Sequence, residues 1–140
     1  MSIQVVWQEL FPLSEDARWG YTNCLYAYIS PRHNEILYIG KANGCSVRQR
    51  WNASDKKINF WQPLEEQRGI YEHITLLGEI YLEIGRRFSR QLLSDIESLL
   101  IAYEQPWGNS KCRKSRISRP SMEIKCYGDW VGSRRRYIDY

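Results

Sequence analysis

Two neighbouring segments show the alternation of apolar and amphipathic side chains that is typical of β-strands. In residues 24–29, CLYAYI, Tyr26 and Tyr28 fall on one face and aliphatic residues fall on the other. Residues 36–40, ILYIG, form a second such run. The intervening residues 30–35, SPRHNE, contain a proline and an asparagine, which favour turns. The pattern predicts an antiparallel hairpin.

After the hairpin, the sequence predicts a turn, a short helix, a third strand and a long helix. The dipeptide Asn-Gly at 43–44 predicts a turn, after which Ser46 is suited to cap a short helix. Residues 73–84, HITLLGEIYLEI, predict a third strand. Residues 88–104 repeat apolar side chains at helical spacing, and Pro106 follows the last of them. The periodicity predicts a long amphipathic helix there.

The order hairpin, helix, strand, helix predicts an α/β fold with a small, mostly antiparallel central sheet flanked by helices. Residues 52–70 give no clear pattern, and residues 109–140 are expected to form short strands or loops. A length of 140 residues, of which 43% are hydrophobic, fits one domain, 1–140. The chain begins without a signal-peptide pattern and has no apolar run of membrane-spanning length, so we expect a cytoplasmic protein without membrane contact.

Positive charge is concentrated near the end of the chain. Residues 1–104 carry 11 Lys and Arg against 13 Asp and Glu, whereas residues 105–140 carry 9 against 3. Such a segment is typical of a protein that binds a polyanion, although a solvated surface would have the same composition. The expected nucleic-acid contacts are Arg48, Lys111, Arg113, Lys114 and Arg116.

Several short motifs occur in an order that resembles the GIY-YIG nuclease superfamily. CLY at 24–26 and YIG at 38–40 resemble the two motifs that name it. An arginine follows in VRQRW, where Arg50 fits the family register and Arg48 is the competitor. A glutamate within DIESLLIAYEQPWGN and the terminal asparagine of that segment complete the resemblance, which covers roughly residues 24–109.

The resemblance implies a metal-dependent endonuclease that hydrolyses DNA phosphodiester bonds, with RNA not excluded. It implies that Glu97 holds Mg²⁺ or Mn²⁺ and that Tyr38 is the base. Tyr26 would orient the water or share the proton transfer, while Arg50 and Lys41 would bind the phosphate. Asn109 matches the family asparagine, and we expect it to anchor the chain after the helix.

The same side chains suit phosphodiester cleavage on chemical grounds. A guanidinium matches phosphate oxygens bidentately, and a carboxylate-bound divalent ion offsets the developing charge. Tyrosine is a poor base at its ordinary pKa near 10, so we expect Lys41 and Arg50 to lower the pKa of a strand tyrosine. All these groups are expected to meet in one cleft.

The sequence departs from the family pattern at three points, and several alternative interpretations remain open. Cys24 replaces the first family glycine, Ser54 stands where many relatives carry His or Tyr, and no separate DNA-binding module follows. The tyrosines are also compatible with a structural role in the sheet, and Glu97 with a capping box begun by Ser94. An inactive DNA-binding protein of the same fold is therefore the alternative function, and an interaction domain rich in aromatic residues is the third. The sequence is equally compatible with a monomer and with a homodimer.

Overall fold

The predicted hairpin is present and defines the centre of the fold. The computed structural model describes residues 1–53, 56–109 and 122–138. Strands β2 (Cys24–Ser30) and β3 (Glu35–Ala42) pair antiparallel, with a register irregularity after Tyr28. The turn between them uses Asn34 at a φ of 51°, a left-handed conformation that asparagine tolerates better than most residues.

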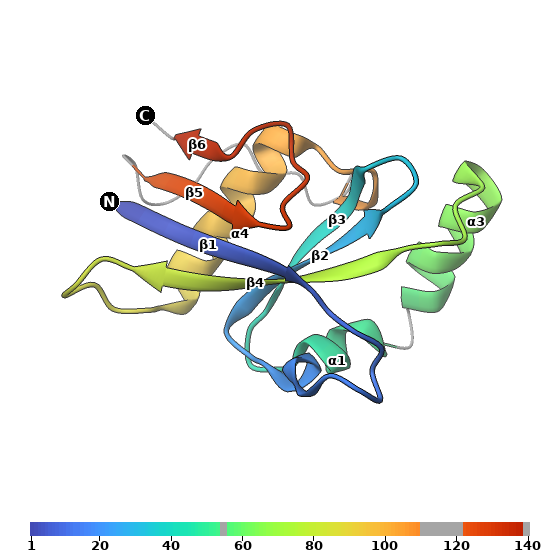
Figure 1. The fold of residues 1–140 in the computed structure, drawn as a ribbon, viewed down its shortest axis with the longest axis horizontal. Coiled ribbons are helices and arrows are strands. Elements are labelled where there is room, and N and C mark those ends of the chain that lie inside the picture. Colours follow the sequence, from blue (N-terminus) through green and yellow to red (C-terminus); the bar gives the residue numbers. More distant parts are fainter. Residues whose placement is uncertain (54–55, 110–121, 139–140) are drawn as a thin grey trace.

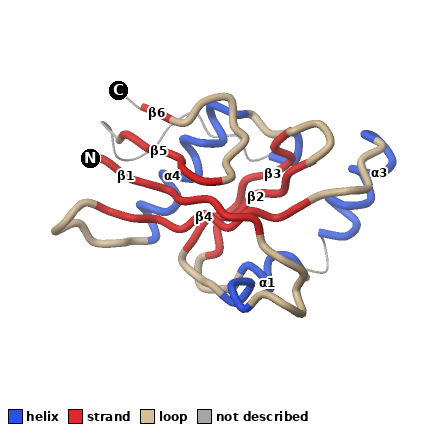
Figure 2. Tube along the Cα trace, in the orientation of Figure 1, coloured by secondary structure: helices blue, strands red, loops and turns tan. Residues whose placement is uncertain are grey.

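The sheet has six strands and extends well beyond this hairpin (Figures 1 and 2). Their order is β3-β2-β4-β1-β5-β6, and only β1 and β5 pair in parallel. The four remaining strands are β1 (Ser2–Glu9), β4 (Ile74–Leu82), β5 (Glu123–Gly128) and β6 (Arg136–Ile138). The α/β class and the mostly antiparallel sheet are confirmed, while β1 is a strand that the sequence pattern did not reveal.

Helix α4 (Arg90–Glu104) crosses the sheet on its far side in Figure 1, and α1 (Val47–Trp51) lies near the ends of β2 and β3. Ser89 caps α4 by accepting a hydrogen bond from the Leu92 N–H. The predicted cap of α1 is confirmed, because Ser46 and Gln49 form a reciprocal capping box. The remaining elements are η1 (Ala17–Gly20), the π-helical turn η2 (Lys57–Trp61), α3 (Gln62–Arg68) and η3 (Trp107–Asn109).

Two hydrophobic clusters lie on opposite faces of the sheet. The first joins α4 to inward side chains of β1, β2, β3 and β5, with Leu25 and Ala27 among them. The second contains Tyr26, Tyr28 and the α1 residue Val47. Since successive residues of a strand point to opposite faces, β2 contributes alternately to both clusters and is buried along its whole length.

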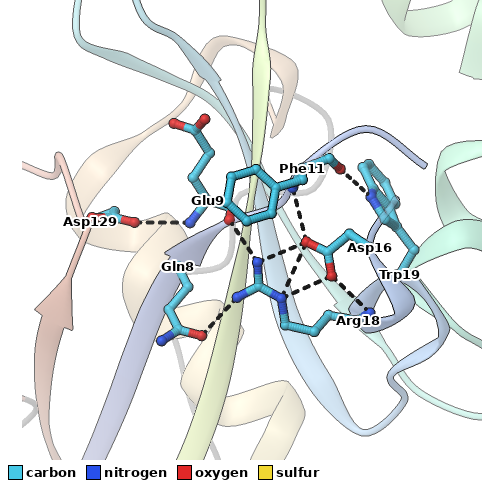
Figure 3. A network of polar contacts seen from close by, with 7 residues as sticks. All are labelled: Gln8, Glu9, Phe11, Asp16, Arg18, Trp19 and Asp129. Carbon is cyan, nitrogen blue, oxygen red and sulfur yellow. Dashed lines mark hydrogen bonds and ion pairs between the residues drawn. The ribbon is translucent and has the colours of Figure 1, made fainter. Parts of the chain in front are cut away.

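A network of charged side chains fixes the segment between β1 and β2 (Figure 3). The carboxylate of Asp16 accepts hydrogen bonds from the backbone N–H groups of Phe11 and Arg18 and from the Arg18 guanidinium. Arg18 also donates to the Gln8 side chain and the Glu9 carbonyl. These contacts hold the pKa of Asp16 below its ordinary value, with the Arg18 hydrogen bond as the largest cause.

None of the helices in the described parts of the chain combines the length and the apolar character needed to cross a membrane.

The Asp16 network predicts a loss of stability in acid. Because the pKa of Asp16 is lower in the folded than in the unfolded chain, its stabilisation is complete above the ordinary Asp pKa near 4 and declines as the pH falls below it. We expect Asp16→Ala to lower the free energy of unfolding by about 1–3 kcal/mol at neutral pH. Urea titrations at several pH values should show that the difference in unfolding free energy between the wild type and Asp16→Ala becomes smaller in acid. The exposed neighbour Glu15 provides the control Glu15→Ala, and an equal loss in both variants would contradict the assignment.

Candidate active site

Three tyrosines from the hairpin form a single aromatic cluster. Tyr26 and Tyr28 are 2% and 0% exposed, and Tyr38 is half-buried. The Tyr38 ring centroid lies 6.0 Å from that of Tyr26 and 5.6 Å from that of Tyr28. Tyr38 also acts on the Tyr26 phenol and raises its pKa, through its charge and through a hydrogen-bonding contribution. The register explains the grouping, because Tyr28 stands opposite Tyr38 and side chains of opposed residues share a face.

Gly40 provides the space that the Tyr26 phenol occupies. Gly40 stands opposite Tyr26 in the hairpin, and a Cβ atom at position 40 would lie 2.5 Å from the Tyr26 hydroxyl oxygen. It would also lie 2.8 Å from Cε2 of Tyr38. Such separations are too short for any side chain, so the glycine of the YIG motif is required by packing. The Tyr26 hydroxyl therefore rests against the backbone of β3.

A lysine that the sequence pattern did not single out completes the cluster. The Lys56 ammonium lies 2.8 Å from the Tyr28 hydroxyl oxygen and 3.5 Å from that of Tyr26. It also lies 4.8–5.4 Å from the centroids of all three tyrosine rings. Lys56 belongs to the stretch 52–70, which has no periodic pattern, so its sequence context carries no signal of this contact.

Burial changes the acid–base character of the tyrosines in a direction that the sequence argument did not anticipate. Desolvation raises the pKa of Tyr26 and of Tyr28 well above the ordinary value near 10. The positive charge of Arg50 acts in the opposite direction on both groups, but burial is the larger effect. The expected lowering of a strand tyrosine's pKa by cations is therefore wrong for Tyr26, whose phenol stays neutral and serves as a hydrogen-bond donor or acceptor.

The two arginines of α1 point to different surroundings. The charge of Arg50 reaches Tyr26 and Tyr28, as noted above. Arg48 instead donates a hydrogen bond to the Leu13 carbonyl at 3.2 Å. Both arginines are exposed and thus accessible to a large anion. Their placement favours Arg50 over Arg48 as the arginine of the tyrosine cluster.

Lys41 and Glu97 form a second group beside the first. The Lys41 ammonium lies 4.0 Å from Oε1 of Glu97 and donates a hydrogen bond to the Ser94 hydroxyl. The alternative role of Glu97 in a capping box begun by Ser94 is excluded, because α4 begins at Arg90 after the cap Ser89. The Glu97 side chain is 13% exposed and lies beside the Lys41 ammonium.

Asn109 holds the chain after α4 against the outer edge of β3. Its side-chain carbonyl accepts from the Ile39 N–H and its amide donates to the Ile39 carbonyl, both at 2.9 Å. The side chain thereby satisfies two backbone groups of β3, which is an edge strand of the sheet formed by the described residues. The residue is 2% exposed, so this geometry matches the anchoring role expected from the sequence.

The predicted site residues thus form two groups on opposite faces of the hairpin, and not the single cleft expected from the sequence. Lys41 stands opposite Leu25 and contacts α4, whereas Tyr26 and Tyr38 belong to the cluster on the other face. The two groups adjoin through the backbone at Gly40 and Lys41. Beyond this end of β3 lies an open hollow of about 580 Å³ lined by Thr22, Asn23, Asn43, Gly44, Phe88, Ser89 and Arg90. The predicted nucleic-acid contacts Lys111, Arg113, Lys114 and Arg116 lie outside the described residues.

The side chains around Glu97 limit how a metal ion could be bound there. In the described part of the chain, no three His, Cys, Asp or Glu side chains are grouped as ligands for one ion. Mg²⁺ commonly keeps several waters and takes one or two carboxylates together with substrate phosphates. Glu97 fits that mode of binding, in which the phosphate of the substrate supplies further ligands.

Comparisons of the chain with protein-family models, with curated proteins and with solved structures find no match. The resemblance to the GIY-YIG superfamily accordingly depends on the motif residues and on their placement.

The contact between Gly40 and the Tyr26 phenol predicts a specific packing defect. We expect Gly40→Ala to displace the phenol and to lower the free energy of unfolding by about 1–3 kcal/mol, as overpacking usually does. Urea unfolding monitored by circular dichroism measures the loss. Gly20→Ala is the matched control, because a Cβ atom at position 20 meets nothing within 4 Å. Equal stability of the two variants would show that Tyr26 does not lie against β3.

The hydrogen bonds of Asn109 predict a second loss of stability, which arises from unpaired backbone groups. We expect Asn109→Ala to leave the buried N–H and C=O groups of Ile39 without partners, costing about 2–4 kcal/mol of unfolding free energy. Hydrogen exchange of the Ile39 amide should accelerate more than exchange at β1, which lies far from this edge. Unchanged protection of that amide would contradict the anchoring role.

Proposed function

We propose that the protein is a GIY-YIG-type endonuclease that hydrolyses phosphodiester bonds in DNA with the help of Mg²⁺ or Mn²⁺. The observation that carries this proposal is the junction at Gly40 and Lys41. There the phenols of Tyr26 and Tyr38 reach one face of the edge strand, and the Lys41–Glu97 pair reaches the other. Groups able to accept a proton, neutralise phosphate and hold a divalent ion therefore flank the same short piece of β3, one set on each face.

Each side chain has a defined task in this reaction. Tyr38 is the half-buried tyrosine and accepts a proton from the attacking water. As the water oxygen bonds to phosphorus, the bond from phosphorus to the leaving oxygen breaks. Tyr26 would donate a hydrogen bond to Tyr38 and orient it. Arg50 and Lys41 bind the phosphate oxygens and offset the charge that builds on them.

Glu97 is the residue that would hold the divalent ion. The bound ion would stabilise negative charge on the phosphate and on the leaving oxygen. Lys41 would then exchange its contact with Glu97 for a contact with the substrate phosphate. The 4.0 Å between the ammonium and Oε1 of Glu97 is long for an ion pair, so the main contact that Lys41 would give up is its hydrogen bond to Ser94.

An inactive DNA-binding protein of this fold is the second candidate, favoured by one observation. Desolvation keeps Tyr26 and Tyr28 neutral, and Ser54 does not supply the proton acceptor that many GIY-YIG relatives carry at that position. Such a protein would bind DNA through its positive side chains, with an affinity that falls steeply as salt increases. It would cut nothing with any divalent ion.

Plasmid nicking distinguishes the two candidates. We expect nicking that needs Mg²⁺ or Mn²⁺ and stops when a chelator is added. Glu97→Gln and Arg50→Ala should each lower its rate by roughly 100-fold or more, because each removes charge stabilisation at the phosphate. The variants Glu72→Gln and Arg32→Ala change exposed residues of the same types and should nick like the wild type.

Salt-dependent DNA binding without metal-dependent nicking would favour the inactive binding protein. Nicking that survives both Glu97→Gln and Arg50→Ala would contradict the site.

A further inference from the structure

The Lys56 ammonium is held inside the tyrosine cluster by polar and aromatic contacts together. It donates to the Tyr28 hydroxyl at 2.8 Å and approaches the Tyr26 hydroxyl at 3.5 Å. Its distances to the centroids of the Tyr28, Tyr26 and Tyr38 rings are 4.8, 5.1 and 5.4 Å, within the range of cation–π attraction. A residue close to η2 is thus tied to both strands of the hairpin.

The chemistry of an ammonium group fixes the direction of these hydrogen bonds. A lysine ammonium has three donors and no acceptor, so the oxygens of Tyr28 and Tyr26 must accept in any bond with Lys56. The proton of the Tyr26 hydroxyl then points away from Lys56, and the neighbouring phenol is that of Tyr38, whose ring centroid lies 6.0 Å from that of Tyr26 and which acts on the Tyr26 pKa. The cluster therefore has a polarity, from Lys56 through Tyr26 to Tyr38. A hydrogen bond donated to Tyr38 favours its ionised form over its neutral form.

We propose that Lys56 is a positioning residue of the site: its ammonium fixes the Tyr26 and Tyr28 hydroxyls as acceptors, directs the Tyr26 proton to Tyr38, and favours ionisation of Tyr38. This inference rests on the proposed function, because it identifies what makes Tyr38 a competent proton acceptor. It also brings Tyr28 into the site, although the family resemblance assigned roles only to Tyr26 and Tyr38. Lys56 thus supports the proton acceptor of the site, a role for which Ser54 is poorly suited.

The surrounding charges support this arrangement. Arg50 is the second cation whose field reaches the phenols of Tyr26 and Tyr28. On the far side of Tyr28 lies Trp61, against which His73 stacks with ring centroids 4.1 Å apart. Burial lowers the pKa of His73, so this imidazole is neutral at physiological pH. The Lys41–Glu97 pair contacts α4, on the other face of the hairpin. Among the described residues, Lys56 and Arg50 are thus the cations that act on the phenols, while the carboxylate of Glu65 acts on His73.

The test is the titration of Tyr38 itself, followed by NMR of ¹³C-labelled tyrosine Cζ, with Tyr38→Phe used to assign the signal. We expect Lys56→Met to raise the titration midpoint of Tyr38 by about one pH unit or more, since it removes the ammonium from the cluster. Lys56→Arg keeps the charge and stacks well on aromatic faces, so its midpoint should stay close to that of the wild type. Tyr28→Phe removes the oxygen that holds Lys56 and should give a smaller rise.

Lys125→Met is the matched control, because Lys125 is an exposed lysine of β5 that pairs with Glu123. It should leave the Tyr38 midpoint unchanged. Amide spectra recorded at each pH restrict the comparison to folded protein, and Lys56→Arg and Tyr28→Phe maintain the test if Lys56→Met does not fold. Equal midpoints in the wild type and in both Lys56→Met and Tyr28→Phe would overturn the inference. So would a wild-type Tyr38 that does not ionise while the chain is folded.

The titration separates this inference from the nuclease proposal, because it needs neither DNA nor metal. Where nicking is observed, the pH at which the rate rises should follow the Tyr38 midpoint and move upward in Lys56→Met. A shifted midpoint in a protein that never nicks would refute the nuclease and leave the coupling of Lys56 to Tyr38 established. An unshifted midpoint in a protein that does nick would refute the role of Lys56 alone.

Discussion

The absence of a side chain at Gly40 is the constraint on which the candidate site depends. The Tyr26 hydroxyl lies where a Cβ atom at position 40 would otherwise be, so the phenol can rest against the backbone of β3. From there it reaches Tyr38 on one side and Lys56 on the other. Any larger residue would push the phenol outward and separate these partners. Pairing of Tyr26 with Gly40 therefore links the register of the hairpin to the geometry of every group around it.

Burial and positive charge oppose each other throughout this site. Removing a phenol from water disfavours the phenolate, and this effect dominates for Tyr26 and Tyr28. Arg50 and Lys56 supply the counteracting charge, but they reach the buried phenols by different routes. Arg50 acts from the exposed surface, where solvent screens it, whereas Lys56 lies directly among the rings. Tyr38 is less buried than either, and the proposed reaction assigns the proton acceptor to it for that reason.

The sequence was sufficient for the features that depend on neighbouring residues. The hairpin, the Ser46 cap and the long helix follow from local alternation, capping and apolar spacing, and all three are present. Strand β1 was not predicted, because it is held by β4 and β5, which are distant in the sequence. The sequence also does not reveal that Lys41 contacts Glu97, nor that burial outweighs charge at Tyr26. Those properties depend on tertiary packing, which local patterns do not encode.

The division of the site between two faces of one edge strand has a physical advantage. A carboxylate beside a phenol disfavours the phenolate, so placing Glu97 among the tyrosines would raise the pKa of any tyrosine base further. Alternation along β3 instead directs Lys41 to α4 and to Glu97, while Tyr38 joins the cluster that contains Lys56. Asn109 holds the outer edge of β3 at Ile39. In the proposed reaction, Tyr38 would accept the proton on one face of β3, Glu97 would hold the metal ion on the other, and Lys41 would offset negative charge on the phosphate.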